Sequence, residues 1–152
     1  MKKYLLDSNI ISEPSKPQPK EIVVERLIKN RKDSAISTLS YFELLHGILI
    51  LPDGKRKERL FAYLEETIVP FFDFISFDFE CAKINAHIRA KLESVGKPLP
   101  LIDSQIASVA LAKNLILVTR NIKDFAPIQD YFPLKIENWG GVIFGMLEKG
   151  TL

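Results

Sequence analysis

The sequence is poor in the residues that commonly bind zinc or form covalent cross-links. Cys81 is the one cysteine among 152 residues, so no internal disulfide can form and no cysteine pair is present for a zinc or redox site. The two histidines, His46 and His87, lie in helical segments where packing or surface roles are expected. This composition disfavours a zinc enzyme and fits a reducing cytoplasm.

Long hydrophobic runs and glycine-rich loops are also missing. The N-terminal MKKYLLDSNIISEP has no sustained apolar segment of the kind found in secretory signals, and no stretch is long enough to span a bilayer. The seven glycines are scattered, which excludes a P-loop, and no serine lies in a G-x-S-x-G turn. We therefore expect a cytoplasmic protein with no membrane partner and with a different chemistry from these classes.

The chain has little excess charge of either sign. Its formal net charge is +2, so any recognition of phosphate must come from local placement of Lys and Arg. The segment PDGKRKERL, residues 52 to 60, is a charged turn that leads into a helix. Both a solvated helix face and an RNA-facing patch are compatible with it.

Short apolar runs alternate with amphipathic segments along the chain, whose length is that of one ordinary domain. We predict strands at residues 3–6, 35–39, 74–77, 115–119 and 134–136, and helices at 20–32, 55–67, 78–96 and 103–114. Runs such as LILVT are apolar throughout, which is typical of parallel strands covered on both faces. The prediction is an α/β fold with a mainly parallel sheet between helices, in a single domain over residues 1–152.

Four acidic residues occupy related places in this predicted pattern. Asp7 follows the first strand, Glu43 lies one turn into the helix after the second strand, Asp103 opens the helix before LILVT, and Asp124 comes shortly after that strand. Functional sites in parallel sheets lie outside the carboxyl ends of the strands. All four acids could therefore rim one pocket at that edge.

Each of these acids also has a purely structural interpretation. Asp7 and Asp103 could cap the turns or helices that follow them, Glu43 could form a capping box with Ser40, and Asp124 could be a surface turn residue. Several unrelated caps would not generally meet at one edge of a sheet. The coincidence favours a shared function.

A cluster of carboxylates suggests a divalent cation, because like charges within roughly 4 to 6 Å raise one another's pKa and an unmetallated cluster would destabilise the fold. Mg²⁺ prefers such hard oxygen ligands and is commonly held by one or two carboxylates together with substrate phosphate. A site of this kind can hydrolyse a phosphodiester. Ser8 and Thr119 could donate hydrogen bonds to phosphate or to water, and Arg120 could bind phosphate, although a surface role for Arg120 is equally compatible.

Four segments of the chain resemble, in order and spacing, the PIN-domain ribonucleases of the VapC type, which are the toxins of bacterial toxin–antitoxin pairs. These segments are LLDSNIISE, ISTLSYFELLHG, PLPLIDSQIASVALAKNLILVTRNIKDF and IENW, between residues 4 and 139. The set is specific although no single motif is decisive. Within the family the chain is most similar to members whose first motif reads D-x-N-x-x-S-E.

The resemblance implies an α/β/α sandwich and RNA cleavage that depends on Mg²⁺ or Mn²⁺. It further implies a homodimer, a small cognate antitoxin that inserts into or covers the acidic pocket, and possible assembly into a larger toxin–antitoxin complex. Asp7, Glu43 and Asp103 match the three main acids of the family, with Asp7 and Asp103 expected as direct metal ligands.

Two positions depart from the family pattern. Ser8 occupies a place where threonine is more usual, and the hydroxyl is retained. Asn121 occupies a place where many members carry a fourth acid. Two arrangements follow: Asp124 completes the site, or the site works with three carboxylates and the Asn121 amide.

Two other functional classes remain open. A haloacid-dehalogenase-type phosphatase also has a strand followed by an aspartate, but Asn9 replaces the second acid of its D-x-D motif. A catalytically weak PIN-like binding module would be compatible with the change at Asn121. For the ribonuclease interpretation, the apolar tail at residues 139–152 is expected to pack on the domain, on a twin subunit or on an antitoxin.

Overall fold

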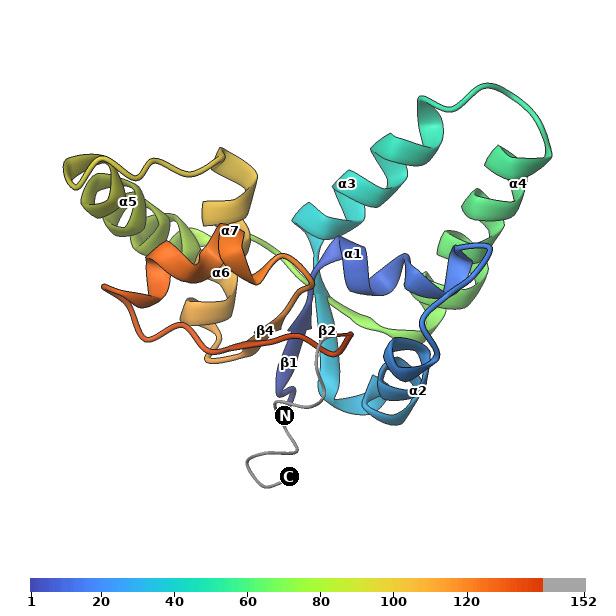
Figure 1. Ribbon diagram of the computed structural model, residues 1–152, viewed down its shortest axis with the longest axis horizontal. Helices are drawn as coiled ribbons and strands as arrows, with labels where there is room; N and C mark the ends of the chain where they lie inside the picture. The colour runs from blue at the N-terminus through green and yellow to red at the C-terminus, as the bar shows by residue number, and fades with distance from the viewer. Residues whose placement is uncertain (141–152) are drawn as a thin grey trace.

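A five-stranded sheet with helices on both faces makes up the computed structural model, which describes residues 1–140 (Figure 1). Every strand pairing is parallel, and the strand order is β3-β2-β1-β4-β5. The strands are β1 (Tyr4–Leu6), β2 (Ser34–Ser37), β3 (Asp73–Ile75), β4 (Ile116–Val118) and β5 (Ile136–Glu137). All five lie at the predicted places, and the predicted α/β class with a parallel sheet is confirmed.

The helices form one layer on each side of this sheet. They are α1 (Ser8–Ile11), α2 (Glu21–Lys29), α3 (Thr38–Leu49), α4 (Lys55–Ala62), α5 (Phe79–Ser94), α6 (Leu101–Ala112) and α7 (Ile122–Gln129). A π-helical segment, η3 (Tyr63–Ile68), continues α4, and short 3₁₀ turns lie at Glu13–Ser15, Arg31–Asp33 and Val69–Phe71. Helices α5 to α7 lie on one side of the central strands and α1 to α4 on the other (Figure 1).

The central strand β1 separates two hydrophobic cores. Leu5 is fully buried among residues of α5, α6, α7 and β4. Its neighbours Tyr4 and Leu6 face the opposite way, into a core built with α1, α2, α3 and η3. Because successive side chains of a strand point to opposite faces, three residues are enough to anchor both layers. The end of β1 is therefore fixed from both sides.

Local sequence signals set most of the helix ends. Helix α5 begins where the Asp78 carboxylate accepts a hydrogen bond of 3.1 Å from the Cys81 N–H, and Gly96 follows its end with φ of 74°. Both signals agree with the prediction. The prediction for α6 is wrong by two residues, because the helix begins at Leu101 behind Pro100. Asp103 thus lies within the first turn and is not a cap.

The cap of α3 also differs from the expected capping box. The Ser37 hydroxyl accepts a hydrogen bond of 3.1 Å from the Ser40 N–H, so the helix begins three residues earlier than a Ser40 cap would require. Glu43 lies in the second turn of α3. The capping-box interpretation of Glu43 is therefore wrong, and its carboxylate is free for another role.

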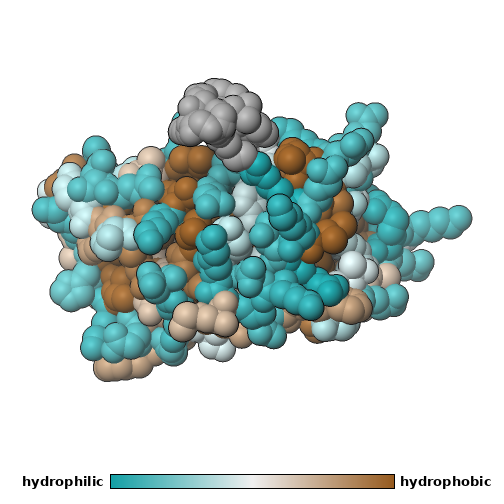
Figure 2. Space-filling view, turned by 90° about the horizontal axis from the view of Figure 1, so that it is seen from below, coloured by the Kyte–Doolittle hydropathy of each residue, from teal (hydrophilic) through white to brown (hydrophobic). Residues whose placement is uncertain are grey.

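The face at the amino ends of the strands is mostly hydrophilic, and its hydrophobic areas are separated by polar side chains (Figure 2). None of the helices within residues 1–140 combines the length and apolarity needed to cross a membrane. The expected packing of the tail falls mainly on residues 141–152, which lie outside the described part of the chain. Trp139, at the start of that tail, is buried with its ring edge against Tyr4, with ring centroids 5.1 Å apart.

We predict that Ser37→Ala lowers the free energy of unfolding by about 1 kcal/mol, because the Ser40 N–H loses its acceptor at the start of α3. Denaturant unfolding followed by circular dichroism measures this loss. Ser40→Ala is the matched control, since it keeps the backbone N–H that Ser37 caps. A larger loss in Ser40→Ala than in Ser37→Ala would contradict the assignment of the cap.

Candidate active site

Four acidic side chains lie near the carboxyl ends of β1, β2 and β4, where their charges interact. Asp7 follows β1 directly, Glu43 comes from α3 after β2, Asp103 comes from α6, and Asp124 lies in the first turn of α7 after β4. The charges of Asp7 and Asp103 both act on Glu43, and the charge of Asp124 acts on Asp7 and Asp103. The structure thus brings together the four acids that the sequence placed at one edge.

Asp7 is the most deeply buried of the four, with 6% of its surface exposed. Its Oδ1 accepts a hydrogen bond of 2.9 Å from the Ser8 N–H, so it does cap α1. Its Oδ2 accepts a bond of 2.8 Å from the Thr119 hydroxyl. Burial raises the pKa of Asp7, the two hydrogen bonds lower it, and the charge of Asp124 raises it again, so that the net direction is upward. Asp7 therefore both caps α1 and belongs to the acidic cluster.

Thr119 is the centre of a network that orients Asp7. Its Oγ1 accepts hydrogen bonds from the Asn121 N–H at 3.0 Å and from Asn9 Nδ2 at 3.3 Å, and it donates to Asp7. Asn9 Oδ1 in turn accepts the Arg120 N–H at 3.1 Å. The sequence assigned the Thr119 hydroxyl to phosphate or water. In the structure this proton is directed to Asp7.

Glu43 and Asp103 share a half-buried setting. Burial raises the pKa of Glu43, and the negative charges of Asp7 and Asp103 raise it further, while a hydrogen bond from the Ser8 side chain lowers it. Burial also raises the pKa of Asp103, together with the charges of Asp7 and Asp124. The Ser8 hydroxyl is therefore directed to Glu43, and its expected donation to phosphate or water stays a prediction.

Glu13 also lies in this region, although sequence analysis assigned no role to it. Its side chain is 1% exposed and forms ion pairs with Arg120 Nη1 at 2.6 Å and with Lys16 Nζ at 3.0 Å. Burial raises its pKa, but the hydrogen bond from the Lys20 N–H at 2.8 Å and the cations Lys16 and Arg120 outweigh it, so the net pKa is lowered. The signal in the sequence that could have identified Glu13 is its place as the last residue of the D-x-N-x-x-S-E motif.

The donor set fits a hard divalent cation. No three His, Cys, Asp or Glu side chains within residues 1–140 form a group that could enclose a metal by themselves. Mg²⁺ and Mn²⁺ do not require such an enclosure, because Mg²⁺ keeps several waters and often takes only one or two protein carboxylates. Burial is the largest cause that raises the pKa values of Asp7, Glu43 and Asp103, and the charges of neighbouring acids raise them further. A cation would relieve this repulsion.

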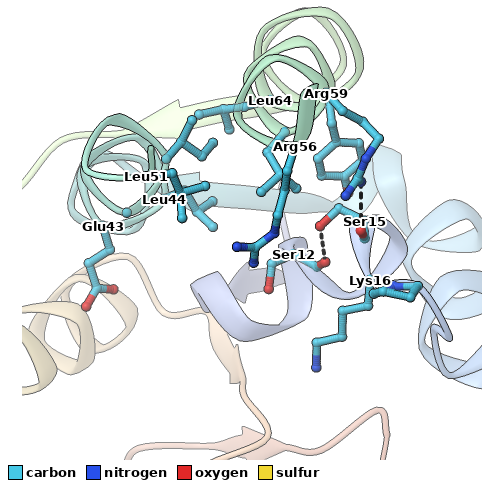
Figure 3. Close-up of a pocket in the computed structure, with 14 residues that line it drawn as sticks. Ser12, Ser15, Lys16, Glu43, Leu44, Leu51, Arg56, Arg59 and Leu64 are labelled. Atoms are coloured by element: carbon cyan, nitrogen blue, oxygen red, sulfur yellow. Dashed lines mark hydrogen bonds between the residues drawn. The ribbon is translucent and has the colours of Figure 1, made fainter. Parts of the chain in front are cut away.

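A cleft of about 480 Å³ begins beside Glu43 and runs between α3 and α4 (Figure 3). Its apolar lining includes Leu44, Leu51 and Leu64, and Arg56 extends into it from α4. Its remaining lining residues are Ser12, Ser15, Lys16, Pro17, Gly47, Ile48, Arg59, Leu60 and Tyr63. Among the four acids, Glu43 lines this cleft and the other three lie outside its lining. The cleft is therefore next to the acidic cluster without being the same site.

The two histidines do not join the cluster. Both are exposed, and the His46 ring stacks on Phe42 with centroids 5.6 Å apart. The expected surface role of these residues is confirmed. The charged segment at residues 52–60 is also largely exposed, with Lys57 paired to Asp53 at 3.2 Å and Arg59 Nη1 donating to the Ser15 carbonyl at 3.1 Å.

The sequence model of the PIN domain matches residues 4–129. Toxin FitB of Neisseria gonorrhoeae is 38% identical over 126 residues, which cover 80% of this chain and 89% of that protein. The tRNA(fMet)-specific endonuclease VapC of Shigella flexneri is 32% identical over 139 residues, which cover 91% of this chain and 99% of that protein.

Solved structures of toxin–antitoxin complexes are similar to this chain in fold. The crystal structure of FitAcB from N. gonorrhoeae matches with a TM-score of 0.82 and 34% identity over 91% of this chain and 99% of that one. DNA-bound VapBC from Salmonella typhimurium matches with a TM-score of 0.77 and 30% identity, again over 91% of this chain and 99% of that one. Both matches extend over nearly all of the described residues.

We predict that Glu43→Gln stabilises the metal-free protein at neutral pH. Because folding raises the Glu43 pKa above its ordinary value of 4.5, its protonated form favours the folded state below that value, and this contribution is lost as the pH rises through the folded pKa. The melting temperature of the variant in EDTA should therefore exceed that of the wild type by about 2 °C at neutral pH, with little difference at acidic pH.

Glu66→Gln is the matched control for this measurement, because Glu66 is exposed outside the cluster. A Glu43→Gln protein that melts below the wild type at every pH would show that the carboxylate stabilises the fold and is not under repulsion.

Proposed function

Because the chain belongs to the PIN-domain family, we propose that it is a metal-dependent endoribonuclease that acts as the toxin of a toxin–antitoxin pair. The observation that carries this proposal is the meeting of Asp7, Glu43, Asp103 and Asp124 at one edge of the sheet, where burial and mutual charge raise the pKa of the first three. A relative named as an endonuclease and another named as a toxin are similar over most of their length. The name of the endonuclease supports hydrolysis of RNA, and the name of the toxin supports the role in a toxin–antitoxin pair.

Asp7 and Asp103 are proposed to hold Mg²⁺ or Mn²⁺, with Glu43 next to them. When bound, the cation would lower the pKa of an attacking water and neutralise charge on the leaving oxygen. The chain itself supplies orientation, since Thr119 and the Ser8 N–H fix both carboxylate oxygens of Asp7. The carboxylate of Glu43, with its raised pKa, is suited to accept a proton from water at neutral pH.

Asp124 is the better candidate for the fourth acid. Its charge acts on both Asp7 and Asp103, which places it within electrostatic reach of the cluster. Asn121 uses its backbone N–H to bind Thr119, and its side chain is exposed. We therefore propose that Asp124, in the first turn of α7, supplies the fourth acid that Asn121 does not provide.

Phosphate binding is proposed for Ser8 and Arg120. The Arg120 side chain is 28% exposed, and its ion pair with Glu13 uses one of its five N–H donors. A guanidinium held in this way keeps the remaining donors in a fixed direction.

The acidic cluster favours an enzyme over a pure binding module, because relics of a lost site would not be expected to keep buried carboxylates under repulsion. It also disfavours the phosphatase alternative, whose second acid is replaced by Asn9, a residue bound into the Thr119 network.

The partner proposed for the cleft between α3 and α4 is the antitoxin. An apolar floor with Lys16, Arg56 and Arg59 at its margin suits an amphipathic segment that carries acidic residues. A segment in this cleft would pass Glu43 and cover the acidic cluster.

We further propose that the protein forms a homodimer, for which exposed apolar side chains such as Phe42 on α3 and Leu101 on α6 are available near the site.

We predict that the antitoxin-free protein cuts single-stranded or loop RNA with Mg²⁺ or Mn²⁺, and that Asp7→Asn abolishes cutting, because the amide removes the charge that attracts the cation. Gel analysis of RNA fragments with and without EDTA measures the activity, and circular dichroism checks the fold. Asp53→Asn, an exposed carboxylate outside the cluster, is the control. Undiminished cutting by Asp7→Asn or in excess EDTA would refute the mechanism.

We predict that Gly47→Trp blocks the antitoxin without affecting RNA cleavage. A Cβ added at Gly47 meets no atom within 4 Å outside its own helix backbone, and Gly47 lines the cleft, so an indole attached there is expected to extend into it. Affinity for the short protein encoded beside this chain should fall about tenfold or more, as measured by calorimetry. Gly47→Ala, which leaves the cleft open, should retain the wild-type affinity; equal binding by both variants would place the antitoxin elsewhere.

A further inference from the structure

The connection between α5 and α6 determines where Asp103 enters the site. Helix α5 ends with hydrogen bonds from the Gly96 N–H to the Glu93 carbonyl and from the Lys97 N–H to the Leu92 carbonyl. Pro98 and Pro100 then follow, and neither has an N–H to donate. Helix α6 begins without a side-chain cap. The backbone between these helices therefore needs support from another part of the fold.

Arg89 of α5 supplies two hydrogen bonds to this segment. Its Nη1 donates to the Leu99 carbonyl and to the Ser104 hydroxyl, each at 3.0 Å. The Ser104 hydroxyl passes a hydrogen bond of 2.9 Å on to the Leu101 carbonyl. Ser104 is fully buried, and the Arg89 side chain is 28% exposed. One nitrogen thus contacts residues on both sides of Asp103, namely the Leu99 carbonyl before it and the Ser104 hydroxyl after it.

We propose that Arg89 is a positioning residue that places the Asp103 carboxylate in the candidate active site by fixing Leu99 and Ser104. This inference rests on the proposed function, in which Asp103 is a metal ligand. Arg89 itself touches neither the acids nor a substrate. Its role is to set the start of α6 against α5, so that the carboxylate two residues into the helix reaches the edge of the sheet.

The action of Arg89 is geometric and not electrostatic. The raised pKa of Asp103 results from burial and from the charges of Asp7 and Asp124, whereas a guanidinium acting on Asp103 through its charge would lower that pKa. The charge of Arg89 is instead engaged with Glu93, at 3.5 Å between Nη2 and Oε2. Glu93 is 57% exposed and belongs to the same helix, so this pair does not connect to the site.

The alternative is that Arg89 merely joins two helices. In that case its loss would lower overall stability and leave the geometry of Asp103 unchanged in the molecules that remain folded. The two roles differ in three measurable properties: amide hydrogen exchange at residues 99–104, affinity for Mn²⁺, and the division of an activity loss between kcat and KM.

The experiment compares Arg89→Met, Arg89→Lys and Ser104→Ala with the matched control Glu93→Gln. In EDTA, Arg89→Met should exchange faster at residues 99–104 than elsewhere. Its Mn²⁺ affinity, followed by electron paramagnetic resonance, should fall about tenfold, in the range found for residues that orient metal ligands. RNA cleavage should lose kcat with little change in KM and with no shift of its pH profile.

The other variants fix the interpretation. Arg89→Lys should recover part of the Mn²⁺ affinity, because an ammonium can reach one of the two acceptors. Ser104→Ala should show a smaller loss, and the double variant should lose less than the sum of the two single losses, since both changes break the contact between Arg89 and Ser104. Glu93→Gln should behave as the wild type in all three measurements.

Wild-type exchange at residues 99–104 and wild-type Mn²⁺ affinity in Arg89→Met would overturn the inference, as would a displaced pH profile, which would indicate action through charge. If Arg89→Met does not fold, Ser104→Ala and Arg89→Lys decide the matter by the same measurements. If the wild type neither binds Mn²⁺ nor cuts RNA, the proposed function fails, and exchange at residues 99–104 alone then decides whether Arg89 fixes the start of α6.

Discussion

Like charges held at one edge of a parallel sheet repel one another, and this repulsion is the constraint around which the structure is arranged. Asp7 has almost no access to water, and this burial raises its pKa, with a smaller contribution from the charge of Asp124. Stability must come from elsewhere in the fold, since removing a charged group from water is unfavourable without a partner. The two apolar cores on either side of β1 supply it. Within residues 1–140 no cationic side chain forms an ion pair with these acids, and a metal cation would supply that partner.

The site joins the two helical layers, because each layer delivers a different acid. Glu43 comes from α3, which packs into the core that contains Leu6, while Asp103 comes from α6, which packs into the core that contains Leu5. Asp7 lies between them at the end of the strand shared by both cores. A displacement of either layer changes the distance between Glu43 and Asp103, so the contacts that fix α3 and α6 against the sheet also fix the site.

The sequence was sufficient for those features that depend on local pattern. Apolar runs located the strands, and Asp78 and Gly96 located the ends of α5, because each of these signals acts within a few residues. Contacts between distant segments could not be found in this way. The hydroxyl of Thr119 is bound by Asp7, 112 positions away, and a β-strand end followed by threonine has many other uses. The roles of Arg89 and Glu13 were missed for the same reason.

The motif at residues 7–13 acquires a physical meaning when its contacts are followed. Asp7 accepts a hydrogen bond from the Thr119 hydroxyl, Asn9 accepts one from the Arg120 N–H, and Glu13 binds the Arg120 side chain. Three of the four specified side chains of the D-x-N-x-x-S-E pattern therefore bind the two residues that leave β4. Their spacing of two and four residues along α1 and the following 3₁₀ turn directs them to the same short segment. The motif thus joins the ends of β1 and β4, because Asp7 is bound to Thr119 while Asn9 and Glu13 bind the next residue, Arg120.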